Sequence, residues 1–473
     1  MNPNTAKWFD EHLPQKFELA STHVNPTFVK VLRLIGLDRF YVRAEGCYLY
    51  DQDGRRYLDC LGGYCVFNVG HNHPTVRQAL ADALQRNWPN MLQMDASPLS
   101  GLLARELVQR APPGLDMVYF GNSGAEAVEA AMKFARCATG RRRLLACANA
   151  YHGLTYGALS LSGRPECWQP GFEPVLPDCG LVPYNDLPAL ERALKADKVA
   201  AFIVEPIQGE AGVVVPDDDY LPGAQELCRR HGALFVLDEI QTGLGRTGKF
   251  LAAEHWKLEP DMICLAKALS GGFMPVSATL MRRWIFEKVF NKLERSVVHC
   301  STFGENNLAM VAGLATLRVL EQDRLVENSA RIGALLLERL RALQTRHEFI
   351  AEARGKGLFA ALRFGEPRSM KLKLQWKAAH AAAEALFAES IVMTLMREHR
   401  ILTQIAGHDP NVLKITPPLL AGENEIEQIV SALDKVLTDC QKISGPVWET
   451  GKELMKRSLS SRSAEPGGRA GNA

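Results

Sequence analysis

One lysine interrupts the apolar run ICLAKALSGG, residues 263–272. Lys267 stands directly before the turn-forming Ser-Gly-Gly. A desolvated lysine is unstable as a cation and loses its proton readily. Its free amine can then act as a nucleophile that forms a Schiff base with a carbonyl group. The alternative is a lysine at a strand end whose charged head lies in water. This segment by itself leaves both interpretations open.

A second segment, GNSGAEAVEAAMKFAR (121–136), directly follows the strand-like DMVYF (116–120). The pattern predicts a turn at Gly121–Ser123 and then a helix. Free backbone N–H groups at a helix N-terminus, a hydroxyl and a close-approaching glycine together can bind a phosphate. Alternatively, Ser123 is an ordinary N-cap before a core helix.

A third segment, ALFVLDE (233–239), places Asp238 at the carboxyl end of an apolar strand, where sheets of this kind bind ligands. The alternative is a buried aspartate that caps the next turn. Residues 243–248 then match the GxGxxG dinucleotide pattern, and residues 243–249 nearly match a P-loop. Phe250 stands where a P-loop needs Ser or Thr, and four residues separate Asp238 from the first glycine. A nucleotide site is therefore not favoured.

The elements that position these residues alternate between strand-like and helix-like stretches from about residue 75 to 345. The strand-like runs are DMVYF (116–120), RLLACA (143–148), AAFIVEP (200–206), ALFVLDE (233–239) and MICLAK (262–267). Strands that are apolar throughout predict an α/β fold with a mainly parallel sheet buried on both faces. Successive strand ends then supply a phosphate cradle, an acid and a lysine. Those are the three contacts that a pyridoxal phosphate enzyme needs.

Composition narrows the class of protein further. The chain has 473 residues, of which 47% are hydrophobic and 23% charged, and its net charge is +2. This is ordinary globular composition without a basic bias towards nucleic acid. The 11 cysteines form no CxxC pair, so we expect free thiols, no metal site and a reducing, cytoplasmic location. We also expect no secretory signal and no membrane-spanning helix.

Seven motifs resemble, in their order along the chain, those of class III (omega-type) aminotransferases of pyridoxal-phosphate fold type I. They are LDCLGGYCVFNVGHNHP, GNSGAEAVEAA, YHGLTYGALSLSG, VEPIQGEAGVVVP, LDEIQTGLGRTGKF, AKALSGG and STFGENNLA. The resemblance covers about residues 30–440. It implies a large pyridoxal-phosphate domain (76–345) and a smaller α+β domain (346–445), which the N-terminal segment (1–75) joins. The tail, 446–473, is small and polar, and its end is expected to be disordered.

The resemblance implies roles for residues around the cofactor. Lys267 would carry the cofactor and move the substrate proton, and Asp238 would pair with the pyridine nitrogen. Gln241 would reach the phenolic oxygen. Tyr151 would stack on the ring with His152 beside it, although each is by itself more typical of a structural core residue.

Further roles follow from the same resemblance. Ser123, Gly124 and Ala125 would hold the phosphate, and Glu205 would support the cofactor region. Thr302 would reach the phosphate of a neighbouring subunit, which implies a homodimer with two composite active sites.

Two positions depart from relatives whose substrates carry a second carboxylate. Leu154 replaces an arginine that members using ornithine, acetylornithine or 4-aminobutyrate carry, and an apolar side chain cannot form that forked ion pair. Lys414 stands where glutamate-using members often have arginine, paired with Glu210. Lys414 either contacts the substrate or only ion-pairs with Glu210. Tyr64 is also expected to line the substrate site. The acceptor stays open between pyruvate and 2-oxoglutarate.

Segment 366–408 is longer than in many members and resembles that of aminotransferases acting on lipid-like substrates. Its first part interleaves basic and apolar residues, namely Arg368, Met370, Lys371, Leu372, Lys373, Leu374, Trp376 and Lys377. This pattern is typical of weak contact with a membrane surface through residues 366–377, or of a solvated helix face.

We therefore predict an aminotransferase that moves an amino group from an amine or amino acid donor to an aldehyde, ketone or 2-oxo acid, with a hydrophobic or extended amine as substrate. Its partners would be these small molecules and a second copy of the chain. The alternatives are a racemase, decarboxylase or phospho-lyase on the same fold, a nucleotide-dependent enzyme, or a non-catalytic binding protein. A binding protein would be expected to lack Lys267 or Asp238.

Overall fold

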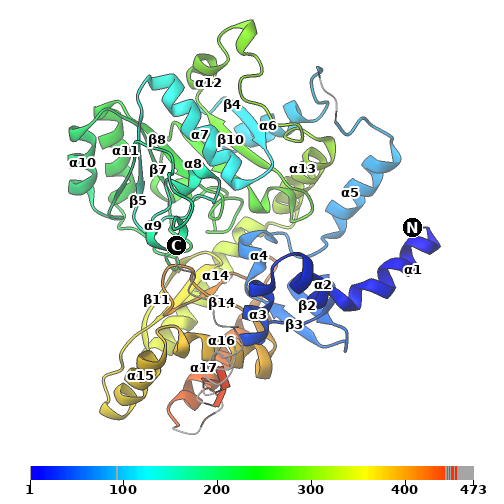
Figure 1. Cartoon of the computed structure of the whole chain (residues 1–473), viewed down its shortest axis with the longest axis vertical. Coiled ribbons are helices and arrows are strands. Elements are labelled where there is room, and N and C mark those ends of the chain that lie inside the picture. Colours follow the sequence, from blue (N-terminus) through cyan, green and yellow to red (C-terminus); the bar gives the residue numbers. More distant parts are fainter. Residues whose placement is uncertain are drawn as a thin grey trace, which may run out of the picture.

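The computed structural model describes residues 2–91, 94–442, 445, 447, 449–451 and 453–454. A seven-stranded sheet forms the centre of the larger part of the molecule (Figure 1). Its strands are β4 (Met117–Gly121), β5 (Arg143–Cys147), β6 (Cys179–Val182), β7 (Val199–Val204), β8 (Leu234–Asp238), β9 (Met262–Leu265) and β10 (Ser277–Met281). They lie in the order β4-β10-β9-β8-β7-β5-β6. Only β10 runs antiparallel to its neighbours within this sheet, so the predicted α/β fold with a mainly parallel sheet is confirmed.

Helices cover both faces of this sheet because alternate residues of each strand point to opposite sides. In β8, Leu234 and Val236 pack in one apolar cluster with α7 (Gly124–Thr139) and α12 (Arg283–Val289). Phe235 and Leu237 pack in the other cluster with α10 (Leu187–Ala196), α11 (Tyr220–His231) and α13 (Asn307–Gln322). Every residue of β8 is therefore buried, which explains why the strand is apolar throughout.

The sequence pattern did not predict β6 and β10, for two different reasons. β6 is an edge strand that is half-exposed and contains Gly180. β10 is fully buried but carries hydroxyl groups, and the Thr279 hydroxyl donates to the Ala127 carbonyl at 3.1 Å. Neither strand therefore shows the purely apolar run that marks the other five.

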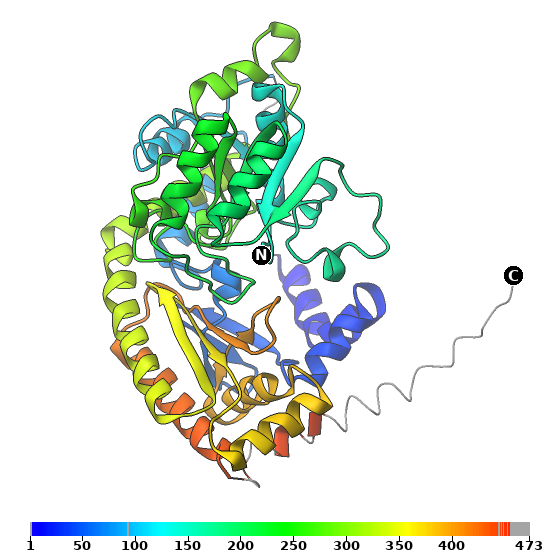
Figure 2. The same ribbon diagram turned by 90° about the vertical axis from the view of Figure 1, so that its left-hand side faces the viewer.

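The smaller part of the molecule combines both ends of the chain. One sheet contains β1 (Tyr41–Glu45), β2 (Tyr48–Asp51), β3 (Arg56–Asp59) and β13 (Ile401–Leu402), in that order. The other has the order β11-β12-β15-β14, with β11 (Ile350–Lys356), β12 (Phe359–Phe364), β14 (Gln404–Ile405) and β15 (Val412–Ile415). β13 pairs in parallel with β3, so the N-terminal strands lie beside the C-terminal portion (Figure 2). A turn that includes Asp53 and Gly54 connects β2 and β3.

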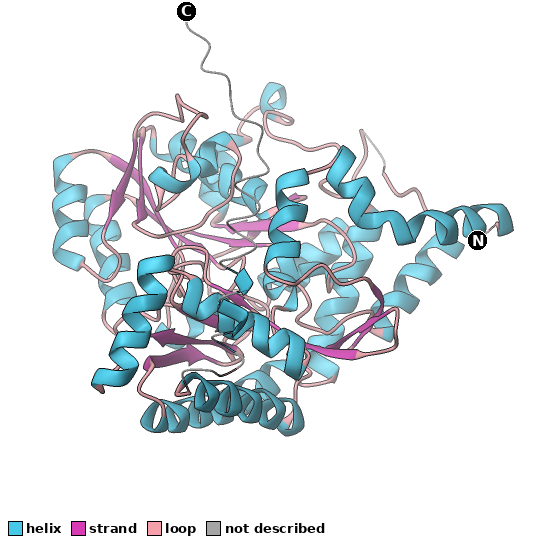
Figure 3. Ribbon diagram, turned by 60° about the horizontal axis from the view of Figure 1, so that its bottom comes forward, coloured by secondary structure: helices cyan, strands magenta, loops and turns pink. Residues whose placement is uncertain are grey.

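Long helices pack around these two sheets. They are α14 (Leu325–Arg346), α15 (Met370–Ala382), α16 (Leu386–His399) and α17 (Glu423–Cys440). The N-terminal helices are α1 (Pro3–His12), α2 (Lys16–His23) and α3 (Pro26–Leu34), and α1 extends away from the body (Figure 3). The remaining helices are η1 (Leu13–Gln15), α4 (Gly62–Cys65), α5 (Pro74–Gln85), α6 (Ser100–Val108), α8 (Tyr156–Leu159), α9 (Pro165–Trp168), η2 (Ala252–Trp256), η3 (Lys267–Ser270) and η4 (Leu293–Arg295).

Within the described residues, no single helix has both the length and the apolar composition needed to cross a membrane. In the part of the chain that the structure describes, only α15 and α16 taken together meet those two criteria, and they are bent by 97° relative to each other. The end of the predicted tail lies outside the described residues.

Candidate active site

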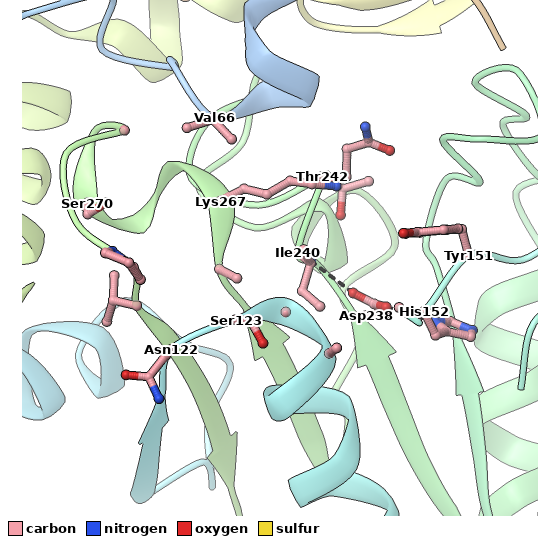
Figure 4. Close-up of a pocket in the computed structure, with 18 of the residues that line it drawn as sticks. Val66, Asn122, Ser123, Tyr151, His152, Asp238, Ile240, Thr242, Lys267 and Ser270 are labelled. Carbon is pink, nitrogen blue, oxygen red and sulfur yellow. Dashed lines mark hydrogen bonds and ion pairs between the residues drawn. The ribbon is translucent and has the colours of Figure 1, made fainter. Parts of the chain in front are cut away.

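A cavity of about 560 Å³ lies at the carboxyl ends of β4, β8 and β9 (Figure 4). Loops that follow or precede the strands form its wall, with residues 122–125, 151–154, 205, 238, 240–242, 266–267, 270 and 272–276, together with Val66. Parallel strands bring their carboxyl ends to one edge of the sheet, so segments distant in sequence meet here. The phosphate-cradle segment, Asp238 and Lys267 all line this one cavity.

Lys267 is the first residue of η3 and follows β9 after one residue. Its φ is +43°, a left-handed conformation that is unusual for a residue with a side chain and is typical of functional sites. The side chain is partly buried and extends across the cavity in Figure 4. The side chain of Lys267 therefore places its amine in the cavity.

Asp238 and His152 form a buried pair on the opposite side of the cavity. His152 Nδ1 lies 2.7 Å from Asp238 Oδ2, and Asp238 Oδ1 accepts the N–H of Ile240 at 3.0 Å. Burial alone would lower the pKa of His152, but the hydrogen bond to the Asp238 carboxylate raises the pKa above its usual value. Asp238 is thus both the turn-capping residue and a ligand-facing acid, so the two sequence interpretations of this residue do not conflict.

Glu205 supports the same region from the end of β7. Its carboxylate accepts the backbone N–H of Tyr151 at 2.9 Å and that of Gly209 at 3.0 Å. Complete burial raises the pKa of Glu205 to about 7. Glu205 therefore holds the loop that presents Tyr151 and His152 to the cavity.

The turn between β4 and α7 forms the cavity floor. Ser123 is the N-cap of α7 and accepts the N–H of Glu126 at 3.2 Å. The loop at residue 153 packs closely on the helix start, because a Cβ on Gly153 would lie 2.7 Å from Cβ of Ala125. A Cβ on Gly124 would lie 3.0 Å from Ile240. Gly124 and Ala125, at the start of α7, thus line a cavity that larger side chains would narrow.

These residues fit pyridoxal phosphate by the chemistry of their groups. Lys267 supplies an amine for the aldehyde, Asp238 an acid for the pyridine nitrogen, and the N-terminus of α7 a binding site for the phosphate. Nε2 of His152 is buried and has no hydrogen-bond partner among the described residues. Tyr151 and Gln241 also line the cavity, as predicted for cofactor-binding residues.

The predicted substrate residues lie at the mouth of the cavity and beside it. Leu154 lines the cavity and is half-exposed. Lys414 is buried and its Nζ lies 2.7 Å from Glu210 Oε1 and 6.0 Å from the ring centroid of Tyr64. Although burial would raise the pKa of Glu210, the Lys414 ammonium holds the pKa below its usual value. The expected ion pair is present, and contact of Lys414 with a substrate stays a prediction.

Thr302 lies elsewhere in this single chain. It lines a second cavity of about 880 Å³ together with residues 90–91, 94–95 and 296–307 in part. Asn122 belongs to the first cavity, and its Nδ2 donates to the Ser301 hydroxyl of the second at 2.7 Å. The two cavities are thus neighbours, separated by the β4–α7 turn.

Sequence reasoning missed two aromatic side chains near Tyr151. The ring of Trp168 packs edge-on against Tyr151 with 5.8 Å between centroids. Trp168 Nε1 in turn donates to His408 Nε2 at 2.9 Å. His408 comes from the loop between β14 and β15, far away in sequence, and no local pattern marks such a contact.

The GxGxxG stretch is a series of turns and is not followed by a helix that could bind a phosphate. Its glycines allow close packing instead. A Cβ on Gly248 would lie 2.8 Å from Cα of Ala330 in α14, and a Cβ on Gly245 would lie 2.9 Å from Leu419. The glycines therefore have a structural explanation.

The chain is similar in sequence and fold to known proteins. Residues 35–437 match the family Aminotransferase class-III. The chain is 37% identical over 452 residues to aminotransferase PigE of Serratia sp. (strain ATCC 39006), with 89% of this chain and 52% of that longer protein covered. It is 38% identical over 446 residues to a putrescine aminotransferase of Pectobacterium atrosepticum, with 91% of this chain and 89% of that protein covered.

The fold is similar to that of a solved ornithine aminotransferase of Toxoplasma gondii. The TM-score is 0.75 with 34% identity, over 84% of this chain and 90% of that one. The chain spans about half the length of PigE but most of the other two proteins. Lys267, the Asp238–His152 pair and the N-terminus of α7 lie at one cavity. The family match over residues 35–437 shows that the chain belongs to the class III aminotransferases, enzymes of fold type I that use pyridoxal phosphate.

Proposed function

We propose that this chain transfers an amino group from a hydrophobic or extended amine to a small oxo acceptor. The observation that carries the proposal is the joint placement of Lys267, the Asp238–His152 pair and the N-terminus of α7 at one cavity. Pyridoxal phosphate, when bound, supplies an electron sink for the carbon that loses its proton. The chain's own residues then have to hold the cofactor, orient the donor and move that proton.

The residues divide this work by position. The Lys267 amine, on a flexible stem within the cavity, serves as the base that takes and returns the proton. Asp238 carries a negative charge that keeps a bound pyridine nitrogen protonated, and His152 fixes the orientation of that carboxylate through its 2.7 Å contact. The buried position of both side chains strengthens these interactions because the local dielectric is low.

Leu154 supports an amine without a carboxylate close to the reacting group. Its side chain is apolar, lines the cavity and is half-exposed at its mouth. Putrescine, which names the relative at 38% identity, is a diamine with no carboxylate. An apolar mouth of this kind accepts a methylene chain better than a charged group.

The test compares donors under single-turnover conditions. Purified holoenzyme without an oxo acceptor is mixed with alkyl monoamines, α,ω-diamines, ornithine or 4-aminobutyrate, and the loss of visible absorbance is followed. We expect the amines without a carboxylate to react fastest. Adding pyruvate or 2-oxoglutarate should restore the absorbance. A racemase, decarboxylase or phospho-lyase would need no such oxo acceptor to complete its reaction. Fastest reaction with the two carboxylate-bearing donors would refute the proposed substrate class.

A matched variant sharpens this experiment. Leu154→Arg adds a forked cation at the cavity mouth, so it should improve kcat/KM for ornithine relative to a diamine by about tenfold or more, the value of one charge-assisted hydrogen bond. Leu181→Arg, at an exposed strand residue outside the cavity, serves as the control. An unchanged donor ratio in Leu154→Arg would contradict the role of this position.

We also propose that the chain acts as a homodimer with composite sites. Support comes from the surface around Thr302, where Phe303, Val297 and Leu293 are 57%, 66% and 89% exposed. Apolar groups gathered around a large cavity are typical of an interaction surface. Because that cavity adjoins the one that holds Lys267 across the β4–α7 turn, a second copy seated there would bring its own residues close to the site.

A weak contact with an anionic membrane surface is a separate proposal. Leu372 and Trp376 of α15 are buried and pack in the small domain, so they do not contribute. Met370 and Leu374 are 72% and 64% exposed, and Lys371 and Lys377 are also exposed on this helix. Co-sedimentation with phosphatidylserine vesicles, compared with phosphatidylcholine vesicles, tests the contact. Binding that a Lys371→Glu/Lys377→Glu variant retains would contradict it.

We further propose a cytoplasmic location, supported by the 11 cysteines, all of which are free thiols. Free thiols persist in a reducing compartment. Fractionation of the source cells tests this proposal, and recovery of the protein from an oxidising compartment would contradict it.

A further inference from the structure

Tyr151, which faces the cofactor site, is held from behind by a chain of contacts that ends in the small domain. Its ring packs against the edge of Trp168 at 5.8 Å and an interplanar angle of 68°. The indole N–H of Trp168 donates to Nε2 of His408 at 2.9 Å. Since an indole nitrogen can only donate, Nε2 of His408 must be the unprotonated acceptor.

The other ring nitrogen of His408 completes this arrangement. Nδ1 of His408 then carries the proton and donates to the carbonyl of Asn149 at 2.9 Å, two residues before Tyr151. A single imidazole thus holds the backbone that leads into Tyr151 and, through Trp168, the edge of its ring. The Trp168 contact requires the neutral ring, because an imidazolium has no acceptor, whereas the Asn149 contact requires only that Nδ1 carries a proton.

The backbone of His408 is itself tightly held. Its N–H donates to the carbonyl of Glu210 at 2.9 Å, and its own carbonyl accepts Nη1 of Arg164 at 2.8 Å. His408 is buried, with 7% of the residue exposed. Burial lowers the pKa of His408 against the opposing effects of the Asn149 hydrogen bond and the Glu210 charge, and the charges of Arg164 and Lys414 lower it further. The surroundings therefore favour the neutral ring.

We propose that His408 is a positioning residue, which fixes the ring of Tyr151 at the cofactor site through its hydrogen bond to Trp168, while its bond to the Asn149 carbonyl keeps the proton on Nδ1 and so leaves Nε2 free to accept. His408 touches neither the reacting atoms nor the cavity wall. Its role is to lock the β14–β15 loop of the small domain onto the loop that carries Tyr151. The proposal rests on the cofactor of the family and does not depend on which amine is the donor.

Two substitutions separate the two hydrogen bonds of the ring. His408→Gln keeps an acceptor near the position of Nε2, and His408→Asn keeps a donor near the position of Nδ1. Trp168→Phe keeps an aromatic edge but removes the indole N–H. His347→Asn, at a buried histidine that hydrogen-bonds Asp434 on the far helices, is the matched control. Circular dichroism and thermal unfolding confirm that each variant is folded.

The readout is the dissociation constant of pyridoxal phosphate for the apoenzyme, together with the visible circular dichroism of the bound cofactor. We expect His408→Asn and Trp168→Phe each to weaken binding by about three- to tenfold, the range for loss of one neutral hydrogen bond. The double variant His408→Asn/Trp168→Phe should bind pyridoxal phosphate no more weakly than either single variant, because both substitutions remove the same hydrogen bond. His408→Gln should stay within about twofold of the wild type, since it keeps that bond.

A pH series provides the second readout. Because the pKa of His408 is lowered, binding by the wild type should weaken only at acidic pH below the ordinary range of imidazole, where the ring gains a proton and loses its acceptor, and His408→Gln should lack this component. Fully additive effects in the double variant, equal loss in His408→Gln and His408→Asn, or unchanged binding in His408→Asn would each overturn the proposal. If wild-type apoenzyme bound no pyridoxal phosphate, the assignment of function would fail instead, so the two failures are distinguishable.

Discussion

Among single residues, two buried glutamates near Asp238 have a strongly raised pKa. They are Glu205 and Glu239. Burial raises the pKa of each carboxyl to about 7. Glu239 is held by the N–H groups of Ala252 at 2.7 Å and Ala253 at 2.8 Å. An unfolded glutamate has a pKa of about 4.3. The folded protein therefore binds protons that the unfolded chain releases, so these two groups stabilise the fold below the unfolded pKa, and this contribution is lost as pH rises through about 7.

A substitution at Glu239 tests this linkage. Glu239→Gln removes one titrating group, so its melting temperature should fall less than that of the wild type between about pH 5 and pH 8. We expect the two slopes to differ by about 2 °C or more over that range. Calorimetry at one protein concentration measures the effect, and Glu384→Gln, at an exposed residue, is the control. Parallel slopes for wild type and Glu239→Gln would show that Glu239 keeps its ordinary pKa.

Lys267 is the residue on which the chemistry depends most. Lys267→Ala removes the amine that holds the cofactor and moves the proton, so kcat should fall by about 10²–10⁴-fold or more. The visible absorbance of the purified protein should also change. Spectra and turnover are compared with those of Lys249→Ala, whose lysine is exposed and lies outside the cavity. Turnover that survives in Lys267→Ala would remove the basis for every role assigned here.

At the level of secondary-structure elements, the turns of GLGRTG (243–248) hold together three segments that are distant in sequence. Arg246, in the middle of these turns, is completely buried. Its guanidinium donates to the carbonyls of Leu358 at 2.9 Å and Pro417 at 2.6 Å, and to Oδ1 of Asn68 at 2.6 Å. These partners come from both ends of the chain, so this arginine joins the small domain to the loop after β8. A stretch that matches a nucleotide pattern thus has a packing role.

Removal of the guanidinium should destabilise the fold. Arg246→Met leaves three buried acceptors without a donor, which costs about 3–5 kcal/mol, as for other broken buried networks. Thermal unfolding should show a clear decrease in melting temperature. Arg318→Met removes an arginine whose side chain is 62% exposed and serves as the control. A wild-type melting temperature in Arg246→Met would mean that this contact does not hold the domains together.

Dimerisation is the question that belongs to the whole molecule. Lys267 and Thr302 line different cavities of one chain. If each active site combines Lys267 of one subunit with Thr302 of the partner subunit, two defective variants should complement each other. A mixed dimer of Lys267→Ala and Thr302→Asp subunits would contain one site with both native residues and one site with neither.

Complementation measures this arrangement directly. Thr302→Asp places a negative charge where a phosphate is expected and should reduce activity strongly. Refolding or co-expressing the two variants should restore about a quarter of wild-type activity, because half of the dimers are mixed and each has one intact site. The proteins are tagged differently so that mixed dimers can be purified. Mixed dimers as inactive as their parents would exclude composite sites of this kind.

Local sequence patterns predicted an element correctly wherever the residues of one segment were sufficient to indicate it. An apolar run that ends in Asp238 or Lys267 reports a buried strand and a polar residue at its carboxyl end. A serine before a helical stretch reports the start of α7 at Gly124. The half-exposed β6 and the hydroxyl-bearing β10 lack such a run, because an edge position and a satisfied buried hydroxyl both relax the demand for apolar residues.

By itself the sequence determined the alternation of elements, the sheet type and which residue types stand at strand ends, because burial on two faces imposes those choices locally. Only the tertiary structure decided which polar groups meet. His152 pairs with Asp238, Glu210 with Lys414 and Trp168 with His408 across long stretches of chain. Such pairs depend on loop paths and side-chain directions, which follow from the packing of the whole molecule and leave no periodic trace in either partner's own segment.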